Sequence, residues 1–381
     1  MDFTHDDEQV ALRDAVRALL TKKYGDFEER RRTVRAEPGF DETLWRQLAE
    51  MGVLGLAFDE EYGGMGAGPV EIGLVAEEIG RVLAPEPFLA AVVLGGGAVA
   101  AAGTETQRAE LIAALASGEL RLALAHHDGG TPTRAEGSGD AWTLTGVKEP
   151  VLSGDAERLV VSAELPEGGT GLFLVDGDAV TRTTSRAYDG SRVSRVELDR
   201  TAATPLGEPG VDASAALASV LDLGRIAACH EALGGMAVAL ETTTAYLKSR
   251  KQFGVPLNTF QALNFRAADM YVSLELTRST VAWATMVVAS GADPALTHEA
   301  VTRAALQTSR AGRHVGQEAV QLHGGIGMTA EYLVGNITAH LTALDHLLGD
   351  GRRHLTELAA GVDGYPGLDP LAPTMRSASS A

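Results

Sequence analysis

The stretch Ser249-Arg-Lys-Gln-Phe-Gly-Val-Pro-Leu-Asn-Thr-Phe-Gln261 joins two long segments in which apolar residues recur at helical spacing. The segment before it ends in basic residues, which suit the C-terminus of a helix, and Gly254 and Pro256 then interrupt the helical pattern. Beyond Phe260 the apolar spacing resumes. The sequence therefore predicts two long helices that meet at a basic and aromatic corner.

The residues of this corner suit a nucleotide cofactor. Arg250 can hold a phosphate with its planar guanidinium fork, Gln252 and Gln261 can donate and accept hydrogen bonds, and Phe253 offers a flat ring face. The alternative is a solvated helix end followed by an ordinary turn. Residue types alone leave both interpretations open.

Two motifs resemble the C-terminal signature of the acyl-CoA dehydrogenase family, flavoproteins that desaturate acyl-CoA thioesters. The first is the corner itself, from Arg250 to Leu257, followed by Phe260-Gln261 and Ala268-Asp269-Met270. The second is Gln321-Leu-His-Gly-Gly-Ile-Gly327, further along the chain. Because the two motifs occur together, the resemblance is specific.

The resemblance implies an FAD site that is shared between subunits. It assigns to the cofactor the residues Arg250, Gln252, Phe253, Gln261, Gln321, Gly324 and Gly325. The arginine, the first glutamine and the phenylalanine match positions that contact pyrophosphate and adenosine in the family. The two glycines match a segment in which the backbone approaches the flavin from across a dimer, which the lack of a side chain permits.

The order of patterns along the chain matches the domain order of this family. Helical periodicity dominates residues 1–119, short β-type runs between Gly, Asp, Pro and Ser fill 120–212, and helical periodicity returns over 213–360. We therefore expect a mainly α fold with an N-terminal helical domain, a middle antiparallel β-barrel or sandwich, and a C-terminal four-helix bundle. Residues 361–381 are expected to form a flexible tail. The expected helices are 6–24, 41–51, 69–83, 88–102, 106–116, 213–248, 259–290, 295–324 and 329–360.

The composition limits the possible partners. The chain has 381 residues, a formal net charge of -19 and one cysteine, Cys229. This charge argues against nucleic acids and anionic membranes, and a single cysteine excludes an internal disulfide and a thiolate zinc cluster. His323 has no further ligands at zinc spacing, so no metal site is expected. The acidic start lacks the order of a signal peptide and no stretch is suited to span a membrane, so we expect a soluble cytoplasmic protein.

Two segments of the middle region depart from the family pattern. Gly146 and Lys148 keep the Gly-x-Lys part of a Gly-x-Lys-x-x-Ile-Thr segment, but Pro150 and Leu152 stand where an aromatic residue and a hydroxyl usually contact the flavin. Residues 124–130 likewise replace the usual Thr-Glu-Pro. We therefore expect a flavin to bind less tightly here, or through other atoms.

The catalytic base is absent from both positions that the family uses. Most members carry a glutamate in a Tyr-Glu-Gly-Thr motif, and the corresponding residues 344–351 contain no glutamate. Another branch places the base directly before an arginine on the helix that leads to the corner. Here that arginine is Arg225, and the residue before it is Gly224.

Glu231 is the carboxylate that lies among apolar residues in the interior of the same helix. Seven residues return it to nearly the face of Gly224, displaced by about 10 Å along the helix axis. A carboxylate in apolar company is costly unless it is functional or paired. Glu231 and Arg225 are therefore the predicted catalytic residues, and the alternative is a structural ion pair of Glu231 with Arg225 or another neighbour. Asp350 is the second candidate for the base.

These features lead to one leading hypothesis and two alternatives. The first is FAD-dependent α,β-dehydrogenation of an acyl-CoA or acyl-pantetheine thioester, with electrons passed to an electron-transfer flavoprotein. The second is a non-catalytic partner subunit of a heteromeric acyl-CoA dehydrogenase. It is favoured by the missing base and by the ending at 347–350, which resembles the small-subunit type of the bacterial enzymes. The third is a flavin oxidase or monooxygenase on the same scaffold. We expect a dimer or tetramer, formed with itself or with a homologous subunit.

Overall fold

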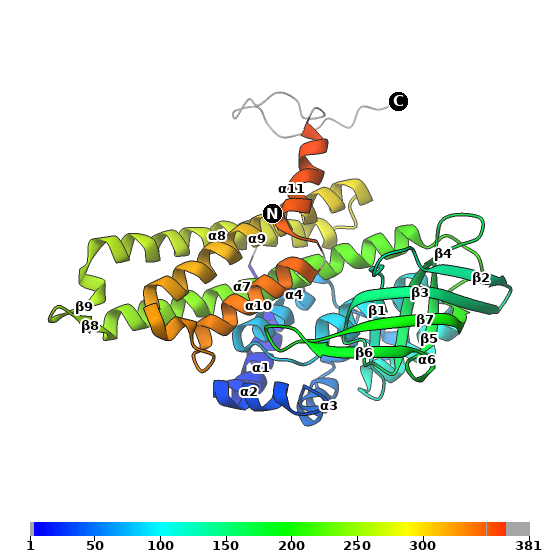
Figure 1. Cartoon of the computed structure of the whole chain (residues 1–381), viewed down its shortest axis with the longest axis horizontal. Coiled ribbons are helices and arrows are strands. Elements are labelled where there is room, and N and C mark those ends of the chain that lie inside the picture. The colour runs from blue at the N-terminus through cyan, green and yellow to red at the C-terminus, as the bar shows by residue number, and fades with distance from the viewer. Residues whose placement is uncertain (1–3, 348, 363–381) are drawn as a thin grey trace.

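The computed structural model describes residues 4–347 and 349–362, which form three regions in chain order (Figure 1). Short helices come first, then strands, then long helices, which confirms the predicted fold class. Within the described part of the chain, no helix is long and apolar enough to cross a membrane.

Short helices with side-chain caps build the N-terminal region. They are α1 (Asp7–Tyr24), α2 (Phe27–Arg35), α3 (Glu42–Glu50), α4 (Pro69–Val82), the π-helix η3 (Phe88–Gly96), α5 (Gly97–Ala102) and α6 (Glu105–Ala116). Asp6 and Thr104 each form a reciprocal capping box with the glutamine three residues further on. The apolar periodicity of the sequence did not predict α2, because this helix is almost wholly polar and buries only Arg30 and Val34.

Seven strands form one sheet that closes into a barrel. They are β1 (Leu122–Ala125), β2 (Arg134–Ser138), β3 (Ala141–Leu152), β4 (Arg158–Glu164), β5 (Thr170–Asp176), β6 (Thr181–Arg186) and β7 (Arg192–Pro205). Strand β4 pairs with β5, β5 with β7, β7 with β3 and β3 with β2, and β2 returns to β4 where Arg134 meets Glu164. Both β1 and β2 run parallel to β4, so the expectation of a purely antiparallel barrel is wrong at this edge.

The C-terminal region is a bundle of helices that lie side by side, followed by a short last helix that stands at a steep angle to them (Figure 1). It contains α7 (Ser214–Ser249), α8 (Gln261–Ala289), α9 (Pro294–His323), α10 (Leu333–Leu347) and α11 (Gly351–Ala360). The small hairpin of β8 (Lys251–Gln252) and β9 (Val255–Pro256) joins α7 to α8 at the predicted corner. Of the expected tail, residues 363–381 lie outside the described residues.

The expectation of one helix over 329–360 is wrong. The chain turns between α10 and α11, where Gly349 has a φ of 108°. Asp350 then caps α11, since its Oδ1 accepts a hydrogen bond from the backbone N–H of Arg353 at 2.8 Å. Asp350 therefore has a capping role at a helix N-terminus.

Two glycines allow α4 and α7 to cross at close range. A Cβ on Gly80 would lie 1.9 Å from the backbone oxygen of Glu231, and a Cβ on Gly234 would lie 2.0 Å from the backbone oxygen of Glu77. A larger residue at either position would force the two backbones apart. The crossing thus holds the Glu231 segment of α7 against the N-terminal helices.

Candidate active site

The residues that the resemblance assigns to FAD gather at one end of the helical bundle. We call this group the bundle end; its members are Arg250, Gln252, Phe253, Gln261, Gln321, Gly324 and Gly325. The ring of Tyr246 near the end of α7 stacks on His323 at the end of α9, with centroids 4.5 Å apart. This contact brings the two sequence motifs together, and all seven residues are exposed.

The side chains of the bundle end have no visible role within their own chain. Arg250, Gln252, Gln261 and Gln321 make no side-chain hydrogen bond or ion pair with another described residue. Phe253 is 92% exposed and has a φ of 53°, an uncommon conformation for a residue with a side chain. These groups are accessible to a molecule from outside the chain.

The glycines of the bundle end border open space. Gly324 has a φ of 67°, and a Cβ on either Gly324 or Gly325 would meet no atom within 4 Å. Packing within this chain therefore gives no reason for glycine at position 325, whereas close approach of another group would. The residue types and the open space of the bundle end are compatible with a nucleotide cofactor.

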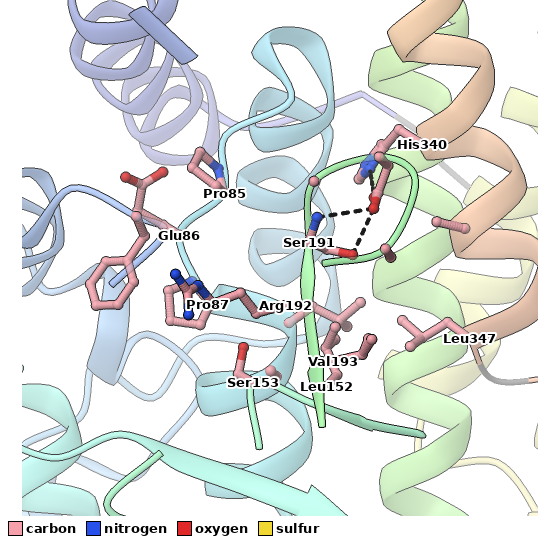
Figure 2. Close-up of a pocket in the computed structure, with 18 of the residues that line it drawn as sticks. Pro85, Glu86, Pro87, Leu152, Ser153, Ser191, Arg192, Val193, His340 and Leu347 are labelled. Carbon is pink, nitrogen blue, oxygen red and sulfur yellow. Dashed lines mark hydrogen bonds and ion pairs between the residues drawn. The ribbon is translucent and has the colours of Figure 1, made fainter. Parts of the chain in front are cut away.

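A separate cavity of about 260 Å³ lies where the N-terminal helices, the barrel, α7 and α10 meet (Figure 2). Its volume is near the lower end of small-molecule sites. Much of its wall is apolar, and this part includes Phe40, Ile79, Leu89, Leu152, Val193 and Leu344. No residue of the bundle end belongs to this wall.

Three buried polar residues from three elements form what we call the polar clamp: Glu231 of α7, His340 of α10 and Asp189 of the turn between β6 and β7. His340 Nε2 meets Glu231 Oε1 at 2.8 Å, and His340 Nδ1 meets Asp189 Oδ2 at 2.9 Å. Burial alone would lower the pKa of His340, but these carboxylates outweigh it and raise the pKa to about 9. The imidazole is therefore protonated at neutral pH, and both nitrogens donate.

The far side of the clamp is anchored to the N-terminal helices. Burial would raise the pKa of Asp189, yet His340 and Ser191 lower it to about 2, so its carboxyl is ionised. Arg30 of α2, itself buried, donates from Nη2 to the backbone oxygen of Asp189 at 2.8 Å and from Nε to that of Leu83 at 2.5 Å. The clamp thus joins all three regions of the chain.

Arg225 and Glu231, the two predicted catalytic residues, are not brought together. Arg225 Nη1 donates to Asp222 Oδ1 at 2.6 Å, and His298 Nδ1 also meets Asp222, at 2.9 Å. Arg225 borders a smaller cavity than the one that Glu231 borders. Of the alternative structural ion pair of Glu231, with Arg225 or another neighbour, the structure shows the second form, because the partner of Glu231 is His340.

The barrel side of the cavity carries both apolar and polar residues. Pro150 and Leu152 border it, as does Ser153, whose hydroxyl has no hydrogen-bond partner among the described residues. Lys148, which belongs to the same family-like segment, is buried in the barrel and donates to Asp128 Oδ1 at 2.7 Å. The lysine therefore stabilises the barrel and does not reach the cavity.

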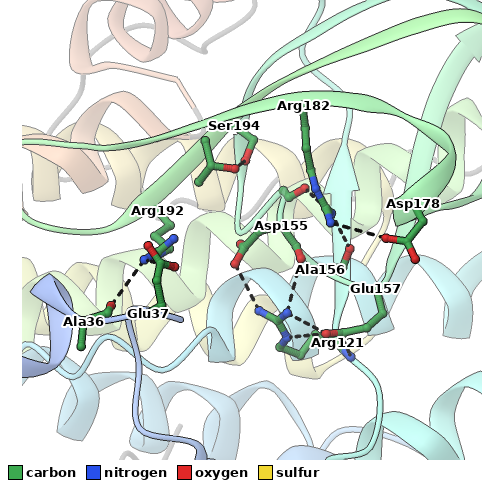
Figure 3. A network of polar contacts seen from close by, with 12 residues as sticks. Ala36, Glu37, Arg121, Asp155, Ala156, Glu157, Asp178, Arg182, Arg192 and Ser194 are labelled. Atoms are coloured by element: carbon green, nitrogen blue, oxygen red, sulfur yellow. Dashed lines mark hydrogen bonds and ion pairs between the residues drawn. The ribbon is translucent and has the colours of Figure 1, made fainter.

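Ion pairs lie beside the cavity, both within the barrel region and, through Arg192 and Glu37, between the barrel and the N-terminal region (Figure 3). Arg121 pairs with Glu157 at 2.6 Å and with Asp155 at 3.5 Å, and Arg192 pairs with Glu37 at 2.6 Å. Because both arginines also border the cavity, these contacts keep its wall in place. No three His, Cys, Asp or Glu side chains within 4–347 and 349–362 are grouped so that they could hold a metal ion.

Sequence reasoning missed most of the polar clamp. It singled out Glu231, but His340, Asp189 and Arg30 belong to no motif and lie far apart in the sequence. The one available signal was the cost of burying a lone carboxylate, which demands a partner without saying which residue it is.

Family comparisons agree with this architecture. The family model described as acyl-CoA dehydrogenase, N-terminal domain, matches residues 6–119, and the one described as acyl-CoA dehydrogenase, C-terminal domain, matches residues 214–362. These matches cover more than half of the chain. The chain therefore belongs to the acyl-CoA dehydrogenase family, whose curated members are oxidoreductases.

Three relatives illustrate the similarity. The probable acyl-CoA dehydrogenase YngJ of Bacillus subtilis is 30% identical over 94% of this chain and 98% of its own. Acyl-CoA dehydrogenase FadE27 of Mycobacterium tuberculosis is 33% identical over 81% of this chain and 84% of its own. Among solved structures, a chain of the ChsE4-ChsE5 complex from Mycobacterium tuberculosis has a TM-score of 0.88 at 28% identity, covering 96% of this chain and 100% of that one.

Proposed function

We propose that this chain acts in the FAD-dependent α,β-dehydrogenation of an acyl-CoA or acyl-pantetheine thioester, as one subunit of an oligomer in which the flavin is bound between subunits. Electrons pass from the flavin to an electron-transfer flavoprotein. The observation that carries the proposal is the bundle end, whose cofactor-type residues are exposed and whose arginine and glutamines make no side-chain hydrogen bond or ion pair with another described residue.

An apolar stripe on α8 supports the oligomer. Phe265, Val272 and Leu276 are exposed and lie at helical spacing on this helix. Such a contiguous apolar face is typical of a surface that another protein covers. A neighbouring subunit on this face also lies beside the bundle end, where α8 begins.

The residues of the bundle end have distinct roles toward the cofactor. When bound, the flavin accepts the hydride that leaves the β-carbon of the thioester. Arg250 holds the pyrophosphate with its guanidinium fork, Gln252 and Gln321 provide hydrogen bonds, and Phe253 lies against the adenosine. Gly324 and Gly325 leave room for the nucleotide beside the backbone.

The proton from the α-carbon has two candidate acceptors. Glu231 borders the cavity and is the carboxylate that the sequence singles out. The second candidate is a carboxylate of a homologous subunit, which makes this chain the partner of a base-bearing one. The polar clamp favours the second, because His340 already occupies one oxygen of Glu231. The name of the ChsE4-ChsE5 complex, which joins two chains, is consistent with such a pairing in a relative.

The absorption spectrum of the purified chain tests the proposed function. Bound oxidised flavin that bleaches when butyryl-CoA, octanoyl-CoA or decanoyl-CoA is added identifies an autonomous enzyme. Flavin that is bound but reduced by none of these thioesters identifies a chain that needs a homologous subunit. A chain that retains no flavin in any oligomeric form contradicts the proposal.

The variant Glu231→Gln separates the two sources of the base. Glutamine keeps the shape of the side chain but removes the basic oxygen. If Glu231 is the base, flavin binding stays intact and flavin reduction falls by at least ~100-fold. If the base belongs to a homologous subunit, the rate of reduction in the complete assembly is nearly unchanged.

A further inference from the structure

The polar clamp leaves one hydrogen-bond acceptor without a partner at the wall of the cavity. Glu231 Oε1 is held by His340 Nε2, whereas Oε2 accepts no hydrogen bond from another described residue. The side chain of Glu231 keeps 9% exposure and borders the cavity. The clamp therefore offers an acceptor to whatever fills this space.

The position of Glu231 is fixed before any ligand enters. His340 holds Oε1, and Asp189 holds His340 from the other side. Asp189 is held in turn by Ser191, whose backbone N–H and hydroxyl both donate to Oδ1, at 3.0 Å and 2.7 Å. An acceptor that is held by a completed network keeps its geometry when the ligand arrives.

The charges of the clamp decide which ligand group suits Oε2. A methyl or methylene group would leave the acceptor desolvated and unpaired. An ionised carboxylate has no proton to donate to Oε2 and would place a negative charge directly against Glu231, and a ketone likewise has no proton to donate. A hydroxyl group alone among these donates a hydrogen bond, remains neutral and is carried by an otherwise apolar chain.

We propose that this cavity takes an acyl chain that bears a hydroxyl group, whose O–H donates to Glu231 Oε2 while its carbon frame packs against Ile79, Leu89 and Leu344. The proposal rests on the proposed function for its ligand class, an acyl-CoA. It gives Glu231 a role in ligand selection instead of proton abstraction. A site built to pair with a hydroxyl discriminates against the analogue that lacks it, because the buried acceptor is then left unpaired.

Calorimetric titration of the purified chain, in the oligomer that it forms, tests this preference. The probes are acyl-CoAs of six to twelve carbons in three matched forms: unsubstituted, ω-hydroxylated and ω-carboxylated. At the length that lets the hydroxyl reach Glu231, we expect the hydroxylated form to bind about tenfold more tightly than the unsubstituted one, and the carboxylated form to bind more weakly. Equal affinity for hydroxylated and unsubstituted chains at every length overturns the proposal.

Two variants make the assignment specific to one residue. Glu231→Met keeps the approximate length of the side chain but removes the acceptor, so the preference for the hydroxyl should fall to about twofold or less. Glu241→Met is the matched control, since Glu241 lies on the same helix but pairs with Arg81 at the surface. The control should keep the tenfold preference. Full preference in Glu231→Met overturns the proposal. If this variant does not fold, the titrations of the unchanged protein still decide it.

The absorption spectra of the same samples separate this proposal from the proposed function. A hydroxyl preference in a chain without flavin supports the cavity assignment and contradicts the flavin function. Flavin that is reduced by acyl-CoAs without any hydroxyl preference supports the flavin function and contradicts the cavity assignment. A Glu231→Met variant that keeps the preference but loses flavin reduction identifies Glu231 as the base and overturns the proposal.

Discussion

His340 is charged because of its two partners and in spite of its burial. A buried imidazole without partners loses its proton readily, as the pKa of His126, lowered to about 4 mainly by burial, illustrates in the same chain. Two carboxylates reverse this effect at His340. The charge state of one residue therefore depends on segments from three parts of the sequence.

We expect the stability of the protein to fall as pH rises through about 9. The pKa of His340 is raised from 6.5 to about 9 by Asp189 and Glu231, with Arg30 close by, so its contribution is complete below pH 6.5 and lost through pH 9. Between pH 7 and 10 the free energy of unfolding should drop by roughly 2–3 kcal/mol through this group. Urea unfolding measures it, and His340→Gln should lack this part of the decline. A variant that declines as steeply as the unchanged protein contradicts the prediction.

Glu86 gives a pH dependence of its own at the edge of the cavity. Burial raises the pKa of Glu86 from 4.5 to about 7, although Tyr24 and the backbone N–H of Asp41 donate to its Oε1. Because the folded protein holds this proton more tightly than the unfolded chain, stability falls between pH 4.5 and 7. Glu86→Gln should raise the free energy of unfolding at pH 8 by roughly 1–3 kcal/mol and change it little at pH 4. An equal effect at both values would show that the carboxyl does not titrate in this range.

The variant Arg250→Lys tests whether the bundle end binds the flavin. Arg250→Lys keeps the positive charge but loses the bidentate fork, so flavin retention should weaken by roughly 1–3 kcal/mol. Flavin occupancy after extensive dialysis is the measurement, and Lys248→Arg, a neighbouring exchange of the same two residue types, is the control. Unchanged occupancy in Arg250→Lys removes this residue from the site.

Individual residues differed in how far the sequence could predict them. Arg250 and its neighbours could be singled out as candidate cofactor residues because their types and spacing form a local motif, and their role stays a prediction. Glu231 was found because a carboxylate in an apolar helix demands an explanation, but its partner was not. His340 lies more than a hundred positions away, and only the tertiary fold reveals such a pairing.

At the scale of elements, apolar periodicity predicted the long helices and failed where other forces shape the chain. Helix α2 is held by its Asp26 cap and by the hydrogen bonds of Arg30, which an apolar pattern cannot express. The break between α10 and α11 depends on one glycine and one capping aspartate within an otherwise helical pattern. The parallel pairing of β1 with β4 is a long-range contact that a strand pattern does not specify.

A glycine at the crossing of α4 and α7 and a glycine of the bundle end should respond differently to substitution by alanine. Gly234→Ala places a methyl group 2.0 Å from the backbone oxygen of Glu77, so we expect a loss of roughly 2–4 kcal/mol in the free energy of unfolding. Gly325→Ala meets open space at a position without a left-handed backbone, so its stability should change by less than roughly 0.5 kcal/mol. Denaturant unfolding of both variants tests this, and similar losses would contradict the close crossing.

At the scale of the whole molecule, the apolar stripe on α8 and the bundle end together predict an oligomer. Leu276→Glu introduces a charge at one end of the stripe, and because this side chain is 58% exposed it should leave the subunit folded. Sedimentation should show dissociation toward the monomer at micromolar concentration, together with loss of bound flavin. A monomeric unchanged protein that still retains flavin contradicts this arrangement.

The separation of the bundle end from the cavity has a genetic consequence under the proposed function. In a homo-oligomer, each complete site would combine the cavity of one copy with the bundle end of another. A copy damaged at Arg250 and a copy damaged in its cavity, each inactive alone, would form mixed pairs in which one site receives both intact parts. Two defective alleles of such a protein would then complement each other in the same cell.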